Sequence, residues 1–442
     1  MGSVLADLRA LLALQGFRRL FTVRLVSQSG DGMFQVGLAT LFFFSATSQG
    51  TAEEVAIAFA VLLAPFTIVG PFAGVFLDRW RRRQVLLWGN LTRVALTAVI
   101  AVVMLTSGVG PWIYVLALLT LSVNRFLLAA LSAAQPRVVD GPLLLTANSL
   151  APTLGAVAAG AGGLIGFVLG LGFEPGRVKD SAALVCAAVA FAVAAGLATR
   201  MDKDLLGPDR IVRGAELRGE FARTAQGLAD GARYLWARRT PGQALTVMAT
   251  HRFVYGVTFI ASILISRNVL ADPADTQAGL AAFGSVLAAS GLGFAFAVLL
   301  TPTLSPRTGP HLWIAIMLCL AAGSQVLLAA TLTWTTMLIG AVLLGLAAQG
   351  AKIAVDTIVQ RDTDDAFRGR AFALYDVLYN AAFVGAAALA ALALPDSGYS
   401  PGVFAGLAVV YVVAAVVYGR FAARTPADVG PVDRGRPARP PA

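Results

Sequence analysis

Charged and polar residues inside long apolar stretches are the groups in this sequence best able to do chemistry. The clearest set comprises Arg24, Gln28, Asp31 and Gln35, whose spacing of four, three and four places them on one face of a helix. A charge in hydrocarbon costs on the order of 2.5–3.5 kcal/mol, so such residues are functional hypotheses by default. We expect Asp31, near the middle of its stretch, to bind and release a proton; the alternative is a hydrogen-bonded carboxylate that only packs helices together.

Later apolar stretches carry further polar groups. Asn124 and Arg125 lie in the fourth stretch, and because a buried arginine needs an anion, we expect Arg125 to pair with Asp31 or with a bound solute. Arg93, in the third stretch, is expected to extend its long side chain to the membrane surface. The seventh, tenth and eleventh stretches add candidate solute contacts, which are His251, Arg252, Tyr255, Gln349, Lys352, Asp356, Tyr375, Asp376, Tyr379 and Asn380.

Lys352 and Asp356 allow a simpler interpretation than solute binding. They are four residues apart, so on a helix they can neutralise each other as an ion pair. Tyr375 with Tyr379 and Asp376 with Asn380 have the same spacing, and we expect these side chains to line a pathway.

The composition indicates the solvent in which these residues must be positioned. Apolar residues make up 57% of the 442 residues and charged residues only 13%, against roughly 25% charged in soluble domains. A membrane-spanning helix needs about 20 predominantly apolar residues. The sequence predicts an all-α membrane protein with spans at 21–46, 55–77, 84–106, 111–133, 148–172, 180–199, 244–267, 278–300, 311–332, 334–358, 371–394 and 401–420.

A polar segment divides these twelve spans into two groups of six. It carries Phe221, Leu228, Tyr234 and Leu235 at helical spacing among charged residues, which predicts an amphipathic helix on the membrane surface; the alternative is a solvated linker. The predicted regions are a lead-in (1–16), an N-terminal six-helix bundle (17–200), the linker (201–243), a C-terminal six-helix bundle (244–421) and a disordered Pro-rich tail (422–442).

The loops indicate the orientation. If both termini and the linker are cytoplasmic, the only basic residues in loops on the other side are Arg177, Lys179 and Arg267, and cytoplasmic loops are the ones enriched in Lys and Arg. The net charge of +10 is therefore interpreted as a topology signal rather than a nucleic-acid surface. Residues 1–16 lack a cleavage pattern, so we expect no removable signal peptide.

Neither metal binding nor a cofactor is expected. Cys186 and Cys319 lie in apolar runs, where cysteine behaves as a small hydrophobe, and no CxxC or Cys/His cluster occurs. His251 and His311 are the only histidines.

The segment "GVFLDRWRRR" between the second and third spans resembles the signature loop of the major facilitator superfamily. The matching residues are Gly74, Asp78, Arg79, Arg82 and Arg83. The resemblance implies two pseudo-symmetric six-helix bundles, with Asp78 facing the helix that begins near Arg370 and the arginines holding the inner gate shut. The second copy, expected after the eighth span, keeps Gly291 and Arg307 and lacks the aspartate.

Within that superfamily the chain resembles drug and siderophore exporters of the macrolide-efflux and enterobactin-exporter type. The resemblance rests on residues 17–38, 134–150, 227–236 and 368–374, and Arg125 resembles the span-four arginine of proton-driven exporters. The fifth span has the glycines of an antiporter motif, in "GAVAAGAGGLIG", but no proline at that place.

These features imply a proton-driven exporter of amphipathic small molecules that works by alternating access. We expect a monomer in the bacterial cytoplasmic membrane, with the solute and membrane lipids as partners and the proton gradient as the energy source. A translocator of lipids or lysophospholipids on the same fold is the alternative. A membrane-embedded transferase would need acidic pairs or a nucleophile in sizeable loops, and the outer loops are short.

Overall fold

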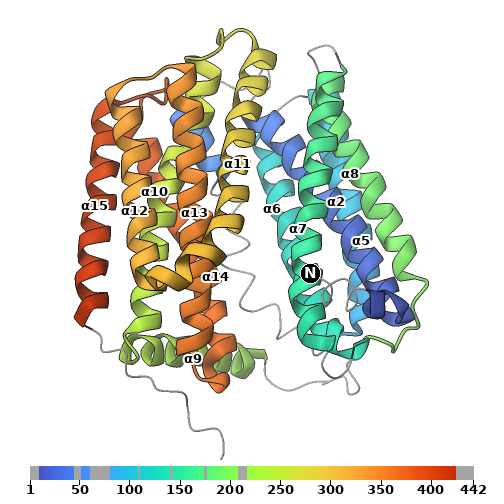
Figure 1. Cartoon of the computed structure of the whole chain (residues 1–442). Helices are drawn as coiled ribbons and strands as arrows, with labels where there is room; N and C mark the ends of the chain where they lie inside the picture. The colour runs from blue at the N-terminus through green and yellow to red at the C-terminus, as the bar shows by residue number, and fades with distance from the viewer. Residues whose placement is uncertain are drawn as a thin grey trace, which may run out of the picture. The chain divides into compact units, whose positions relative to one another are not determined.

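The computed structural model describes residues 9–43, 51–59, 80–107, 110–139, 143–173, 177–207 and 217–424, and all regular secondary structure in these ranges is helical. The long apolar runs form helices because each backbone polar group in lipid must find its partner within its own segment. The elements, drawn in Figure 1, are α2 (Gln15–Phe43), α5 (Arg82–Ser107), α6 (Pro111–Ala134), the short η2 (Gln135–Arg137), α7 (Leu143–Leu171), α8 (Arg177–Ala198), α9 (Leu217–Ala237), α10 (Thr240–Asn268), α11 (Thr276–Thr308), α12 (Pro310–Ala330), α13 (Trp334–Asp362), α14 (Asp365–Ala393) and α15 (Pro401–Arg424).

The predicted all-α membrane architecture is confirmed. Ten helices in the described ranges are long and apolar enough to cross a membrane, and α2 covers the predicted first span with 29 residues. Residues 52–59 are helical, and the rest of the predicted second span lies outside the described residues. The predicted eleventh span (371–394) lies in α14, which begins at Asp365 and has its membrane-spanning part at Gly369–Ala393.

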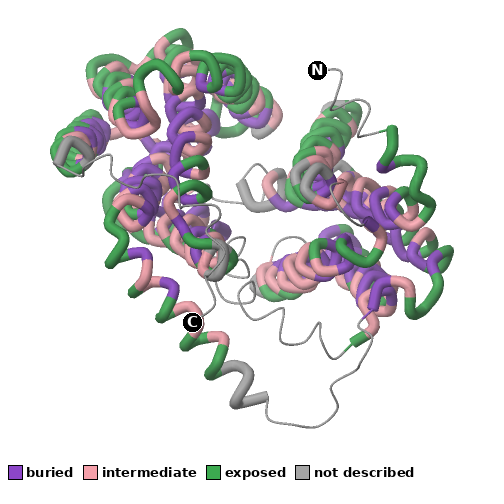
Figure 2. The backbone as a smooth tube through the Cα atoms, turned by 60° about the horizontal axis from the view of Figure 1, so that its bottom comes forward, coloured by how far each residue is buried: buried purple, intermediate pink, exposed green. Residues whose placement is uncertain are grey.

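Large apolar side chains cover the outward faces of the helices. Figure 2 shows buried and exposed positions on opposite sides of many helices. Exposed positions include Val102, Leu164, Val189, Leu299 and Val409, each more than half accessible. A soluble protein would not expose so many large apolar groups, whereas lipid is a favourable environment for them.

The chain packs as two compact units. Unit 1 comprises Met1–Gly227, Gly256–Val286 and Asp376–Ser400, and unit 2 comprises Leu228–Tyr255, Leu287–Tyr375 and Pro401–Ala442. The helices α9, α10, α11 and α14 each contribute one part to each unit. We call the helix ends nearest residues 200–243 the linker end and the opposite ends the far end.

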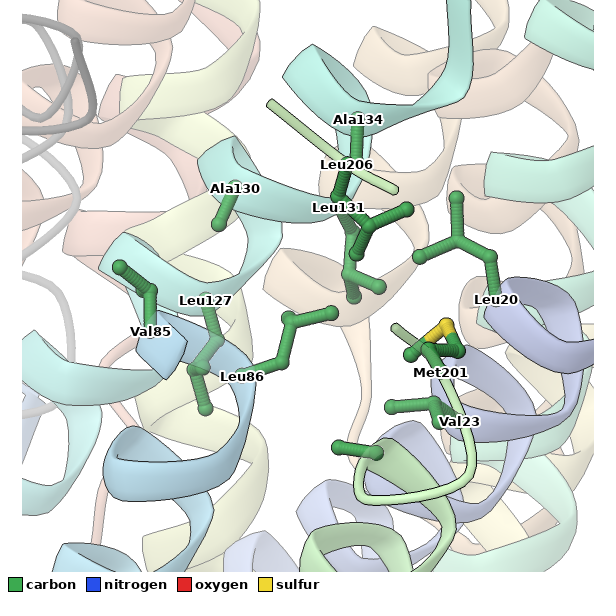
Figure 3. Close-up of a cluster of buried hydrophobic side chains, with 11 residues drawn as sticks. Leu20, Val23, Val85, Leu86, Leu127, Ala130, Leu131, Ala134, Met201 and Leu206 are labelled. Atoms are coloured by element: carbon green, nitrogen blue, oxygen red, sulfur yellow. The ribbon is translucent and has the colours of Figure 1, made fainter. Parts of the chain in front are cut away.

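An apolar cluster holds the linker end of unit 1 together. Side chains of α2, α5, α6 and α8 meet there with Met201 and Leu206, which follow α8 (Figure 3). The contributing residues are Leu20, Val23, Val85, Leu86, Leu127, Ala130, Leu131, Ala134, Ala198, Met201 and Leu206.

Glycines permit close helix crossings in both units. A Cβ on Gly32 of α2 would lie 1.8 Å from the carbonyl oxygen of Ala159 in α7, and one on Gly162 would lie 1.9 Å from that of Ser29. In unit 2, a Cβ on Gly293 of α11 would lie 2.1 Å from the carbonyl oxygen of Val342 in α13. Small residues allow this backbone contact between membrane helices.

The predicted amphipathic linker helix is α9, which lies crosswise to the first turns of α10 in Figure 1. Leu235 is buried, and a Cβ on Gly242 of α10 would lie 2.7 Å from its carbonyl oxygen. The ring of Tyr234 stacks on Phe367 of α14 with centroids 4.2 Å apart. Beside these rings, Arg238 Nη2 and Asp364 Oδ2 form an ion pair and lie 2.7 Å apart.

Candidate functional site

Asp31 pairs with Arg93, not with Arg125 as predicted. Arg93 Nη2 of α5 donates to Asp31 Oδ1 of α2, and Arg93 Nη1 donates to Ser27 Oγ over 3.1 Å. The Arg93 guanidinium carbon also lies 3.5 Å from the ring centroid of Phe191 in α8. The predicted pairing was wrong: α2 and α5 both pack against α8, and the long Arg93 side chain reaches Asp31 beside the ring of Phe191.

The expectation that Arg93 reaches the membrane surface was also wrong, since its side chain is fully buried. Its charge is neutralised in place, and Ser27 Oγ in turn donates to Asn90 Oδ1 over 3.1 Å. Asn90, Arg93 and Thr97 are spaced three and four apart on α5, so the periodicity that singled out Asp31 also marks its partner. This signal was present in the sequence and was overlooked.

Arg125 instead pairs with Asp376. Arg125 Nη2 of α6 donates to Asp376 Oδ2 of α14 over 3.0 Å, and both residues belong to unit 1. Each lies near the middle of its helix, and the two are 251 positions apart in the sequence. The Asp376 side chain is 62% accessible, against 6% for that of Asp31. The accessible carboxylate of the two is therefore Asp376.

In unit 2, Lys352 and Asp356 of α13 form the ion pair that their spacing predicted, with Nζ and Oδ2 2.6 Å apart. Lys352 Nζ also lies 5.7 Å from the ring centroid of Tyr375, which is buried. Asp356 Oδ1 is buried and has no hydrogen-bond partner within the described part of the chain. In the structure, the charges of Lys352 and Asp356 therefore neutralise each other.

The polar residues of α10 form a second group in unit 2. His251 is buried, and Tyr411 of α15 donates its hydroxyl hydrogen to the His251 carbonyl oxygen over 3.3 Å. The Arg252 guanidinium carbon lies 5.4 Å from the ring centroid of Tyr255. Among the described residues, neither ring nitrogen of His251 has a hydrogen-bond partner. Tyr411 was not among the predicted residues, because the twelfth span carries little polar signal.

The remaining predicted residues are dispersed. Arg24 Nε donates to Gln28 Oε1 over 3.2 Å, and Gln35 is exposed. Asn124 is buried, whereas Gln349, Tyr379 and Asn380 are half-buried, and Asn380 Nδ2 donates to the Asp376 carbonyl oxygen over 2.7 Å.

The signature loop is described in part, since Gly74, Asp78 and Arg79 lie outside the described residues. Arg82 Nη1 donates to the carbonyl oxygens of Ala133 and Leu206 over 3.0 and 3.2 Å. Arg83 donates to those of Met201 and Thr199 over 3.3 and 3.4 Å. These arginines satisfy carbonyl groups at and beyond the C-terminal ends of α6 and α8, where cations are favourable.

Four phenylalanine rings pack together toward the far end of unit 1. Phe59 follows α2, and its centroid lies 5.6 Å from that of Phe259 in α10 and 5.3 Å from that of Phe383 in α14. Phe283 of α11 adds an edge contact to Phe259 at 5.7 Å. The backbone N–H of Ala52 donates a hydrogen bond to Asp396 Oδ1 over 3.2 Å, which adds a polar contact there. Far ends from the two sequence halves are therefore packed together within this unit, which the sequence did not predict.

Comparison with known proteins agrees with this architecture. The sequence profile described as Major Facilitator Superfamily matches residues 244–441. The chain is 35% identical over 397 residues to two uncharacterized MFS-type transporters, one from Mycobacterium bovis and one from Mycobacterium tuberculosis, covering 89% of this chain and 88% of each relative.

Solved structures show the same fold at low sequence identity. A POT family transporter in complex with a thioalcohol conjugated peptide has a TM-score of 0.68 at 12% identity, covering 92% of this chain and 96% of that one. The nucleoside transporter NupG has a TM-score of 0.62 at 13% identity, covering 91% and 98%. The chain is a multi-pass membrane protein that belongs to the Major Facilitator Superfamily of transporters.

Proposed function

We propose that this transporter is a proton-coupled exporter of amphipathic small molecules and that Asp376 is its coupling carboxylate, with Arg125 as its counter-ion. The observation that carries the proposal is the ion pair between α6 and α14, near the middle of both helices. A carboxylate that loses a neighbouring arginine binds a proton more readily, because a nearby positive charge favours the ionised form. Proton binding and ion-pair breakage are thereby linked.

Asp376 suits this role better than Asp31, which was the sequence-based choice. A coupling group must exchange protons with water, and the Asp31 side chain is buried against Arg93 and Phe191. Asp31 is accordingly assigned to packing within unit 1, while Arg125 keeps its proposed role with a new partner.

Export is the direction proposed from the resemblance of residues 17–38, 134–150, 227–236 and 368–374 to drug and siderophore exporters. The packed Phe59, Phe259, Phe283 and Phe383 rings support alternating access, since they join far ends of both sequence halves within unit 1 and would have to separate for the far end to open. The orientation proposed from the loop arginines makes the linker end cytoplasmic.

The test uses purified protein in liposomes with an imposed pH gradient and ethidium as the transported probe. We expect Asp376→Asn to abolish gradient-driven ethidium movement while it retains exchange of ethidium down its own concentration gradient. Asp230→Asn removes an equivalent charge from the exposed Arg233–Asp230 pair of α9 and serves as the control. Gradient-driven transport by Asp376→Asn at the wild-type rate would refute the coupling role.

A further inference from the structure

A small cavity lies between α2, α6 and α7 at the linker end of unit 1. Its walls are largely apolar and include the stacked rings of Phe17 and Phe21, 5.3 Å apart, together with Leu131 and Ala151. Two polar side chains, Arg24 and Gln135, also line it. The cavity has a volume of about 10 Å³, which is room for about one water molecule.

Both polar side chains have unused hydrogen-bond donors. Arg24 is 6% exposed, and its only hydrogen bond to a described residue runs from Nε to Gln28, which leaves both terminal nitrogens free. Gln135 is 3% exposed, and its Nε2 has no partner in the described part of the chain. Guanidinium and amide nitrogens only donate, so these two side chains favour a hydrogen-bond acceptor.

Charge specifies that acceptor further. No carboxylate among the described residues pairs with Arg24, whereas Arg93, Arg125 and Lys352 each pair with an aspartate. A buried cation is costly when it lacks a counter-ion, and guanidinium groups bind carboxylate and phosphate oxygens strongly. Gly155 of α7 makes room for the Arg24–Gln28 hydrogen bond, since a Cβ there would lie 1.7 Å from Gln28 Oε1 and 3.1 Å from Arg24 Nε.

We propose that Arg24 and Gln135 form an oxyanion site that takes one oxygen of a carboxylate or phosphate group. Gln135 directly follows the last residue of α6, so the site lies at helix-end depth, where lipid head groups and dissolved anions are both within reach. The shared chemistry is a single oxygen acceptor that carries negative charge. The site does not depend on the coupling role proposed for Asp376.

The test compares the thermal unfolding midpoint of delipidated full-length protein in increasing sodium phosphate or sodium acetate. Binding to the folded state raises the midpoint with ligand concentration. Because phosphate also stabilises proteins generally, the readout is the difference between variants. We expect a larger rise in wild type than in Arg24→Gln. Arg18→Gln makes the same charge change at an exposed position of α2 and should match wild type.

Two further variants keep the test decisive if Arg24→Gln folds poorly. Gln135→Glu supplies a carboxylate inside the cavity, so we expect a higher midpoint without added anion and a loss of the anion-dependent rise. Arg24→Lys keeps the charge and should retain part of that rise.

Two experiments distinguish a dissolved anion from a lipid head group as the source of the oxygen. The first repeats the titration with phosphatidylglycerol or phosphatidylcholine in mixed micelles, and the second uses native mass spectrometry to detect retained lipid. A rise with phosphate or acetate alone identifies a dissolved anion, and a rise with phosphatidylglycerol alone identifies a head group. Equal rises in wild type, Arg24→Gln and Gln135→Glu with every probe would show that the cavity holds only water and would overturn the proposal.

Discussion

Arg125 of α6 and Asp376 of α14 form an ion pair with a 3.0 Å contact, although 251 positions separate them in the chain. Each residue lies near the middle of a membrane-spanning helix, and the helices come from opposite halves of the sequence. A pair in this position ties the arrangement of two helices to the charge state of one carboxylate.

A charge swap tests whether Arg125 and Asp376 act as a pair, separately from proton coupling. Arg125→Asp alone places two carboxylates together and should reduce exchange of ethidium across liposomes at least tenfold, about 1.4 kcal/mol in the barrier. Arg125→Asp with Asp376→Arg restores an ion pair with reversed polarity and should recover much of the exchange rate. If the double variant is no better than the single one, the two side chains do not act as a pair.

The buried Asp31–Arg93 pair should matter for stability. Asp31→Ala leaves Arg93 buried with no countercharge, and breaking a buried pair typically costs about 3–5 kcal/mol. We expect a strongly lowered unfolding midpoint in detergent. Asp31→Leu combined with Arg93→Met removes both charges and should be less destabilised than Asp31→Ala. Asp230→Ala at the exposed α9 pair should be near wild type, and an equally mild effect of Asp31→Ala would contradict the assignment.

The glycine crossing of α2 and α7 provides a matched pair of substitutions. A methyl group on Gly162 would lie 1.9 Å from the Ser29 carbonyl oxygen, which belongs to the backbone and cannot rotate away. Gly160, on the same helix, has nothing within 4 Å of such a group. We expect Gly162→Ala to destabilise by about 1–3 kcal/mol or more and Gly160→Ala to be neutral or slightly stabilising. Similar midpoints for the two variants would show that the helices are not in contact there.

The contact between α9 and the start of α14 should depend on pH. A hydrogen bond with Tyr234, followed by the Arg238 guanidinium, lowers the pKa of Asp364 below its ordinary 3.8. A lowered folded-state pKa stabilises the contact above the unfolded value, and this stabilisation disappears as the pH falls through the folded value. The contact should therefore be intact at pH 7 and weaken only well into acid.

Amide hydrogen exchange across residues 228–237 measures this contact. At pH 7, Asp364→Asn should exchange faster than wild type, and Asp230→Asn should not. Below pH 3.8 the wild type should approach the Asp364→Asn variant. A pH-independent difference between wild type and variant would assign the contact to the Tyr234–Phe367 stacking alone.

The membrane helices were predictable because hydrocarbon imposes a length and a composition on every span. The pairings were less predictable, because they depend on which helices touch. Lys352–Asp356 was recognised, since both residues lie on one helix at fixed spacing. Asp31 was assigned the wrong partner because both arginines lie on other helices and their spacing alone does not show which one reaches Asp31, although the spacing of Arg93 from Asn90 and Thr97 marked the correct face. Tyr411 and the four packed phenylalanines gave no signal, because isolated aromatic residues are common in apolar spans.

The four rings of Phe59, Phe259, Phe283 and Phe383 have an electrical consequence. An energised bilayer stores about 2.3 kcal/mol per unit charge for each 100 mV, and a continuous thread of water through a carrier would discharge it. Packed apolar rings exclude water from the space between them, since apolar constrictions expel water. We expect this packing to limit the leakage of ions through the transporter at rest, so that the membrane keeps its stored voltage while no solute moves.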